Sequence, residues 1–152
     1  MHRLRKLWQL PRRQKALLVR SWYLTGCYQL ALARRPLARL TADMNHSESA
    51  QKVVEVSHEA LFQAHTMGYL VAAASRVTPW RSRCLVQVLV VQHLMAEQQI
   101  PGQILIGVSP SAGGSENEDA FGAHAWLRCG DSIVSGESGS DQYRVISSYT
   151  WQ

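Results

Sequence analysis

The sequence predicts an α+β fold in which N-terminal helices are followed by a small antiparallel sheet. Apolar residues recur every three or four positions through most of the first hundred residues, which is the period of amphipathic helices. Short apolar runs separated by turn residues then follow, as in antiparallel strands. A chain of 152 residues, 46% hydrophobic and 18% charged, is long enough for one core. We therefore expect a single domain over 1–152, with a basic helical region at 1–45 and a core at 46–152.

Three segments have the spacing and length of helices. They are residues 11–40, 50–77 and 81–99. Pro11 lies near the start of the first and Pro36 interrupts it, since proline is tolerated only in the first turn of a helix. Gly68 is expected to weaken the second. The third contains four valines, but its length favours a helix over a strand, and "IPG" ends it.

The rest of the chain has the pattern of short strands around one long polar loop. The strand-like runs are residues 103–108, 123–129, 132–137 and 143–149. The pair Gly130-Asp131 suits a two-residue hairpin turn with glycine first, and it joins two of these runs. Residues 109–122, rich in glycine and serine, are expected to form the loop.

The charge is distributed unevenly along the chain. The formal net charge is +5, yet no acidic residue precedes Asp43. The basic residues in that stretch are Arg3, Arg5, Lys6, Arg12, Arg13, Lys15, Arg20, Arg34, Arg35 and Arg39. Such a region is typical either of a solvated helix face or of a surface that meets an anionic partner.

Composition also limits the compartment and the cofactors. Three cysteines without a CxxC spacing fit neither a disulfide framework nor a zinc knuckle, and they favour a reducing compartment. The apolar stretch "LTGCYQLALA" begins too deep in the chain for a signal peptide and is too short to span a bilayer. We expect a cytoplasmic protein with no integral membrane segment and with neither a metal nor another cofactor.

Cys84 is the first candidate for a chemical role. Ser82 is a plausible N-cap for the third helix, with Thr78-Pro79 as an alternative start one turn earlier. A start at Ser82 places the thiol in the first helical turn, where the helix dipole and the neighbouring arginines favour the nucleophilic thiolate. Packing is the competing interpretation, because Cys84 shares a helix face with apolar residues and free cysteines are often buried.

A cysteine nucleophile requires a base, and His124 in "AHAWL" is the candidate. If the glycine–aspartate pair forms the turn, Cys129 faces Ser132 and His124 faces Glu137. Glu137 then accepts a hydrogen bond from the imidazole and fixes its tautomer. Cys129 lies on the other face of the strand and is expected to pack in the core.

Two stretches carry a resemblance to a known family: "CLVQVLVVQHLMAEQQIPGQILIGV" and "FGAHAWLRCGDSIVSGE". A cysteine that opens a helix, an "IGV" strand, a loop and a "HAW" strand are similar to the lasso-peptide biosynthesis B proteins. These are leader peptidases of the transglutaminase-like cysteine-protease superfamily. The resemblance runs from about Trp80 to the C-terminus. It implies a transglutaminase/papain-like core with Cys84 as the nucleophile and His124 as the general base and later acid.

The resemblance leaves the third catalytic residue open. The family usually has an aspartate on the strand after "HAW", where this chain has Gly136 in "VSGE". Either Glu137 substitutes for it, Asp141 reaches back, or the enzyme works as a Cys–His dyad.

The same resemblance implies a reaction and its partners. The reaction is hydrolysis of one peptide bond, through a thioester acyl-enzyme, in a ribosomally synthesised precursor peptide. The implied partners are that precursor, a small leader-recognition protein and an ATP-dependent macrolactam synthetase, with no nucleic acid.

Two other functions remain as alternatives. The same thioester serves acyl transfer to an amine, as in transglutaminases. A basic, non-catalytic module for nucleic acid or a protein partner is disfavoured, because the chain has no familiar nucleic-acid-binding pattern. A metal held by His58 and His65 is disfavoured too, since two helical turns separate these side chains.

Overall fold

The computed structural model describes residues 10–50, 54–80, 83–109 and 122–152. The helices are α2 (Arg12–Arg34), α3 (Leu37–Leu40), α4 (His58–Ser75) and α5 (Cys84–Glu97), with a 3₁₀ turn η2 at Ser140–Gln142. The strands are β1 (Asn45–Ser47), β2 (Gly102–Val108), β3 (Ala123–Cys129), β4 (Ser132–Ser135) and β5 (Arg144–Trp151). The chain is thus α+β, with helices first and a small sheet second, as the sequence predicts.

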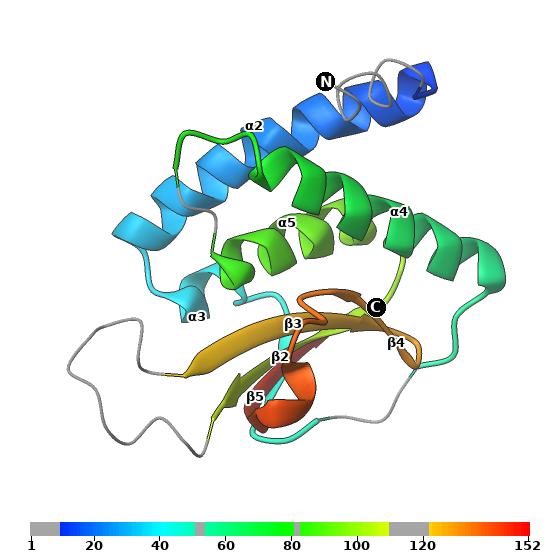
Figure 1. Ribbon diagram of the computed structural model, residues 1–152. Helices are drawn as coiled ribbons and strands as arrows, with labels where there is room; N and C mark the ends of the chain where they lie inside the picture. The colour runs from blue at the N-terminus through cyan, green and yellow to red at the C-terminus, as the bar shows by residue number, and fades with distance from the viewer. Residues whose placement is uncertain (1–9, 51–53, 81–82, 110–121) are drawn as a thin grey trace.

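The strands form one antiparallel sheet in the order β1-β5-β2-β3-β4. Helix α5 lies between this sheet and the outer helices α2 and α4 (Figure 1). Its central position explains its composition, because a helix in contact with other elements on every side is apolar all round. Val88, Val90 and Val91 on α5 are fully buried, although valine favours strands over helices. Burial in the core therefore overrides the weak helix propensity of these residues.

The second predicted helix begins later than expected. The spacing predicts a start at residue 50, whereas α4 begins at His58 and Val54–Ser57 are not helical. Ser57 is the N-cap, and its hydroxyl accepts a hydrogen bond from the Ala60 N–H at 3.2 Å. A serine cap satisfies one of the N–H groups that lack a partner at a helix start, so it fixes the boundary there.

Gly68 has a different role from the one expected. It is buried in the middle of α4, where a Cβ atom would lie 1.9 Å from the carbonyl oxygen of Val134 on β4. The glycine therefore allows the backbone of a helix to approach the backbone of a strand. It is a packing position rather than a weak point.

Two strands differ from their predicted limits. The polar stretch after Leu40 contains β1, a three-residue strand paired with β5 from Asn45 opposite Thr150 to Ser47 opposite Ser148. The boundary between the basic helical region and the core, expected between residues 45 and 46, falls inside this strand. The last strand, predicted at 143–149, extends to Trp151, whose indole N–H donates to the Ile100 carbonyl at 2.9 Å.

The β3–β4 hairpin turns where predicted but changes register along its length. Gly130 has a φ of 59° in the turn, and Cys129 faces Ser132 as expected. Beyond Arg128, which faces Ile133, a bulge shifts the pairing so that Leu127 faces Ser135. One extra residue in β4 moves every later residue by one position. The prediction that His124 faces Glu137 is therefore wrong.

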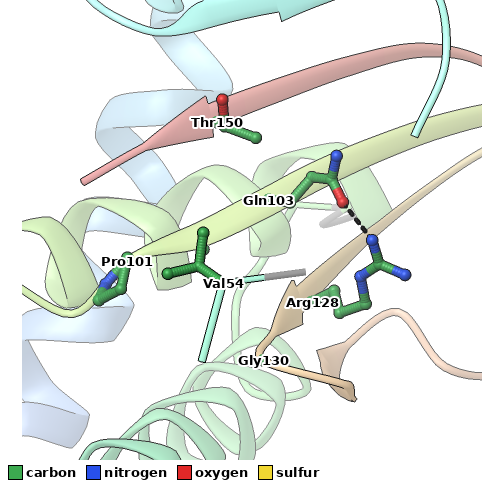
Figure 2. Close-up of a pocket in the computed structure, with 7 residues that line it drawn as sticks. Val54, Pro101, Gln103, Arg128, Gly130 and Thr150 are labelled. Carbon is green, nitrogen blue, oxygen red and sulfur yellow. Dashed lines mark hydrogen bonds between the residues drawn. The ribbon is translucent and has the colours of Figure 1, made fainter. Parts of the chain in front are cut away.

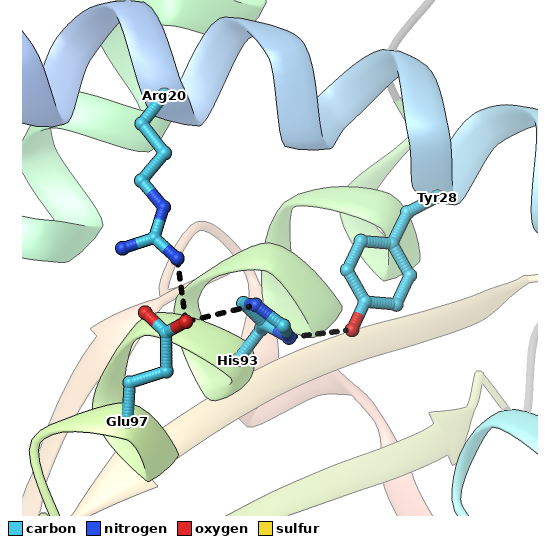
Figure 3. Close-up of polar contacts among 4 residues, drawn as sticks. All are labelled: Arg20, Tyr28, His93 and Glu97. Atoms are coloured by element: carbon cyan, nitrogen blue, oxygen red, sulfur yellow. Dashed lines mark hydrogen bonds and ion pairs between the residues drawn. The ribbon is translucent and has the colours of Figure 1, made fainter.

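Polar side chains connect α2 to α5 (Figure 3). Arg20 on α2 donates to the Glu97 carboxylate at 2.5 Å, and the same oxygen lies 3.4 Å from Nε2 of His93. The Tyr28 hydroxyl lies 3.2 Å from Nδ1 of His93. Burial, followed by the nearby Glu97 charge and Cys27, raises the pKa of Tyr28. Because a carboxylate only accepts, Nε2 of His93 carries the proton, and in the neutral ring Nδ1 accepts from the Tyr28 hydroxyl. Arg20 of the basic region thus has an internal partner.

Candidate active site at the starts of α5 and β3

The starts of α5 and β3 lie at the same end of the molecule (Figure 1). Helix α5 has 14 residues and is about 21 Å long. Strand β2 returns beneath it with 7 residues, about 23 Å. The start of α5 therefore lies near the end of β2, and Val108 at that end pairs with Ala123, the first residue of β3. This topology brings Cys84 and His124, 40 residues apart in sequence, to one end of the fold.

Cys84 is the first residue of α5. The N-cap is Arg83, one residue later than the predicted Ser82, which lies outside the described residues together with Arg81. Arg83 makes no side-chain capping bond, in contrast to Ser57 at the start of α4. The thiol is partly buried against the core, so the packing and chemical interpretations both fit its surroundings. The first N–H groups of a helix start without a side-chain cap remain available as hydrogen-bond donors.

His124 is the second residue of β3 and is partly exposed. It lies on the face of the strand that carries Trp126, whereas Ala125 and Leu127 on the other face belong to the core cluster packed on α5. Its Nε2 atom lies 2.7 Å from the carbonyl oxygen of Gly136. A carbonyl oxygen only accepts hydrogen bonds, so Nε2 carries the proton and donates it. In the neutral ring Nδ1 is then the basic atom.

Two aromatic rings flank the imidazole. The ring centroid of Trp126 lies 5.8 Å from that of His124 in a stacked arrangement, and the ring centroid of Tyr143 lies 5.0 Å away. Trp126 is buried, at 5% exposure, and closes one side of the histidine to water. Tyr143 was not recognised from the sequence as part of this setting, because the register of the preceding turn decides where its ring lies.

The two carboxylates considered as third residues are both exposed. Glu137 follows the bulged strand β4, and its carbonyl oxygen accepts from the Ser140 N–H at 3.1 Å. Asp141 lies in η2, which contacts β3. Among the described residues, the hydrogen bond recorded for the His124 ring goes to the Gly136 carbonyl and to neither carboxylate.

A cavity of about 310 Å³ opens beside the start of α5. Its apolar walls come from both α2 and α5 and comprise Leu32, Ala33, Leu85 and Val86. Gln29 and Arg83 supply its polar groups. The Gln29 side-chain oxygen is buried without a hydrogen-bond partner within the described ranges, so it remains an acceptor. Because Arg83 and Leu85 flank Cys84 in sequence, this space adjoins the thiol-bearing turn.

A second cavity, at the other end of β3, is too small for a peptide (Figure 2). Its volume is about 20 Å³, room for a single water. It lies between Val54, Gly130 and Gln103, whose amide oxygen accepts from Arg128 at 2.5 Å. Packing, rather than substrate binding, accounts for this region.

Cys27 and Cys129 differ from Cys84 in their surroundings. Cys129 is fully buried in the core cluster, as predicted, and burial raises the pKa of its thiol. Cys27 is exposed on α2 and hydrogen-bonds Tyr23, which raises the pKa of that tyrosine. Within the described ranges no three His, Cys, Asp or Glu side chains gather as metal ligands. No described helix combines the length and apolarity needed to cross a bilayer.

The chain matches a family model over most of its length. The model for the transglutaminase-like superfamily matches residues 24–148, from the middle of α2 into β5. The chain belongs to the transglutaminase-like superfamily. The match includes the cysteine helix, the "HAW" strand and much of the helical region before them, so it extends well beyond the segment that carried the resemblance in sequence. Neither the curated proteins nor the solved structures contain a match to the chain.

The superfamily contains cysteine-protease-like and acyl-transfer enzymes, and this sets the general class of the protein. The feature that sequence reasoning missed is the partner of His124, a backbone carbonyl. A backbone group carries no residue signature. The only signal available was the glycine at position 136, where the resemblance called for an aspartate.

Proposed function

We propose that the chain is a cysteine peptidase that removes the leader from a ribosomally synthesised lasso-peptide precursor. Cys84 is the nucleophile and His124 is the base. The observation that supports this most strongly is the Nε2–H···O=C bond to Gly136, because it leaves Nδ1 of the ring as a basic atom at the end of the fold where α5 begins.

The reaction proceeds through a thioester. His124 accepts the thiol proton, and the Cys84 sulfur attacks the scissile carbonyl carbon. The tetrahedral oxyanion is stabilised by backbone N–H groups at the uncapped start of α5. His124 then gives the proton to the leaving amine, and water attacks the thioester with His124 again as the base. Because the imidazole lies on the Trp126 face of β3 and the core around α5 lies on the other face, this mechanism requires the thiol and the ring to meet around the end of the sheet.

The cavity between α2 and α5 provides space for the substrate. Apolar walls and the unpaired Gln29 oxygen fit a peptide with an apolar side chain and an N–H donor. Glu137 and Asp141, the two side-chain candidates for a third catalytic residue, are both exposed, so the proposal takes Cys84 and His124 as a dyad.

The proposed partners follow from the resemblance stated above. They are the precursor peptide, a leader-recognition protein and an ATP-dependent macrolactam synthetase, all in the cytoplasm. The basic face of α2 offers Arg12 and Arg13 for such contacts.

Acyl transfer to an amine is the second candidate, because superfamily membership covers both outcomes. A single experiment separates the two. The full chain is incubated with a complex peptide mixture in ¹⁸O-water with a biotinylated primary amine, and the products are read by mass spectrometry. A peptidase gives new C-termini that carry ¹⁸O, whereas an acyltransferase gives biotinylated peptides.

Two variants connect that result to the site. Cys84→Ser and His124→Ala are expected to abolish product formation, and Cys27→Ser, which removes the exposed cysteine on α2, is the matched control. Unchanged product formation in Cys84→Ser would refute the proposed chemistry. Incubation with a short precursor encoded beside this gene tests the lasso-peptide assignment, with cleavage at one bond as the expected result.

A further inference from the structure

We infer that the backbone carbonyl of Gly136 takes the place of the third catalytic side chain, as a positioning group for the His124 imidazole. This inference rests on the proposed function. Its geometric basis is the 2.7 Å contact from Nε2 to the Gly136 oxygen, in which the ring must be the donor. A hydrogen bond to the second ring nitrogen fixes both the tautomer and the plane of a catalytic histidine.

The bulge in β4 brings this carbonyl to the ring. Without it, continuous pairing from Cys129 opposite Ser132 would place Glu137 opposite His124. With the extra residue, Leu127 faces Ser135, and Gly136 leaves the strand beside Trp126. The bulge therefore exchanges a side-chain carboxylate for a main-chain oxygen at the imidazole.

Only glycine fits at this position. Gly136 has a φ of 76°, a conformation that favours glycine over other residues. A Cβ atom there would lie 2.5 Å from the Ala125 carbonyl oxygen and 2.9 Å from the Trp126 Cα. An aspartate at 136 is thus excluded by the backbone that presents the carbonyl. The glycine is part of the arrangement, because its left-handed φ directs the oxygen at Nε2.

The bulge itself depends on a second glycine. The carbonyl of Val134, the next residue along β4 from Ile133, occupies the space that a side chain at Gly68 would need. Helix α4 thus accommodates the shifted strand through Gly68. Two glycines 68 residues apart in sequence therefore hold one carbonyl oxygen against one imidazole.

The direct test weakens this carbonyl alone. Cys129 allows native ligation of residues 1–128 to a synthetic segment 129–152. In that segment Glu137 is replaced by its α-hydroxy acid, so that the Gly136–Glu137 amide becomes an ester. An ester carbonyl is a weaker acceptor, while the Glu137 side chain is kept. The matched control places the ester one bond later and weakens the Glu137 carbonyl, which accepts from Ser140.

Two readouts separate this inference from the proposed function. The first is NMR of the ¹⁵N-histidine-labelled chain without substrate, which reports the His124 tautomer and the Nε2–H resonance. The expected result is the Nε2–H tautomer, with a proton signal that moves upfield and exchanges faster in the ester at 136–137 but not in the control. The second is kcat/KM, expected to fall about tenfold, the scale of one hydrogen bond.

Three outcomes would overturn the inference. One is an Nδ1–H tautomer in the native chain. Another is that the ester at 136–137 moves the Nε2–H signal but leaves kcat/KM unchanged. The hydrogen bond from His124 to the Gly136 carbonyl would then have a structural role alone. The third is a Glu137→Gln variant that shifts the signal and lowers kcat/KM as much as the ester does, because the carboxylate would then be the acceptor. Failure of the proposed function itself would appear differently, as an intact NMR signature with turnover independent of Cys84.

Discussion

The two ends of β3 use their polar side chains differently. At the turn end, Arg128 donates to Gln103 on the neighbouring strand, and the adjacent cavity holds about 20 Å³. At the other end, the His124 ring is held through Nε2 by a backbone carbonyl. At the turn end Arg128 satisfies the amide oxygen of Gln103, while the amide nitrogen of Gln103 is buried without a partner within the described ranges. At the other end, the bond from Nε2 leaves Nδ1 as the acceptor of the neutral His124 ring. One strand thus has a structural end and an end that carries the proposed base.

The largest expected difference between these ends is in catalysis. His124→Ala is expected to lower kcat/KM by about 10³-fold or more, because loss of the base leaves the thiol without a proton acceptor. Arg128→Met is expected to stay within about threefold of the native value and to lower the melting temperature. Steady-state kinetics and thermal unfolding of both variants measure the contrast. Equal losses of activity would mean that the ends do not differ in function.

The sequence predicted the turn end well and the other end poorly, for a physical reason. The turn needs only the local preference of Gly130, whose φ is 59°. The bulge further along β4 depends on Gly68 of α4, which is remote in sequence. Tertiary contact therefore decides the register near His124, and no local pattern carries that information.

The helices and the edge strand β1 also differ in whether local sequence or tertiary contact determines them. The length and apolar character of α5 were sufficient to identify it, although its cap is Arg83 rather than the predicted serine. The strand β1 has the polar sequence "NHS", and it exists because β5 pairs with it. Cys84 was placed correctly at a helix start, yet the chemical use of that position is not visible in sequence spacing.

The next largest effect is expected on stability, at the contact that sets the register. Gly68→Ala is expected to lower the free energy of unfolding by about 2–3 kcal/mol, because its Cβ would overlap the Val134 carbonyl. His65→Ala, exposed on the same helix, is the control and should change it by less than about 0.5 kcal/mol. Urea unfolding gives both values. A neutral Gly68→Ala would show that β4 is not held in this way.

The smallest expected effect is on how the free energy of unfolding depends on pH, through the buried thiol of Cys129 at the turn end of β3. Burial raises the pKa of Cys129, so the folded chain keeps this thiol neutral after the unfolded chain begins to lose the proton. The stabilising contribution is complete below the ordinary thiol pKa of about 8.5 and declines as the pH rises above it. We expect the free energy of unfolding to fall as the pH rises above about 8.5, and to fall less steeply in Cys129→Ala. If the free energy of unfolding fell equally steeply with pH in the native protein and in Cys129→Ala, the effect could not come from the Cys129 thiol.

The pairing of Cys84 with His124 is tested most directly by the rate of thiol alkylation. Iodoacetamide at about pH 5.5 modifies thiolates, and peptide mass spectrometry reports each cysteine separately. If His124 accepts the Cys84 proton, Cys84 should react at least about tenfold faster than the exposed Cys27, and His124→Ala should remove this advantage. A Cys84 rate equal to that of Cys27, or unchanged in His124→Ala, would show that the thiol and the imidazole do not act together.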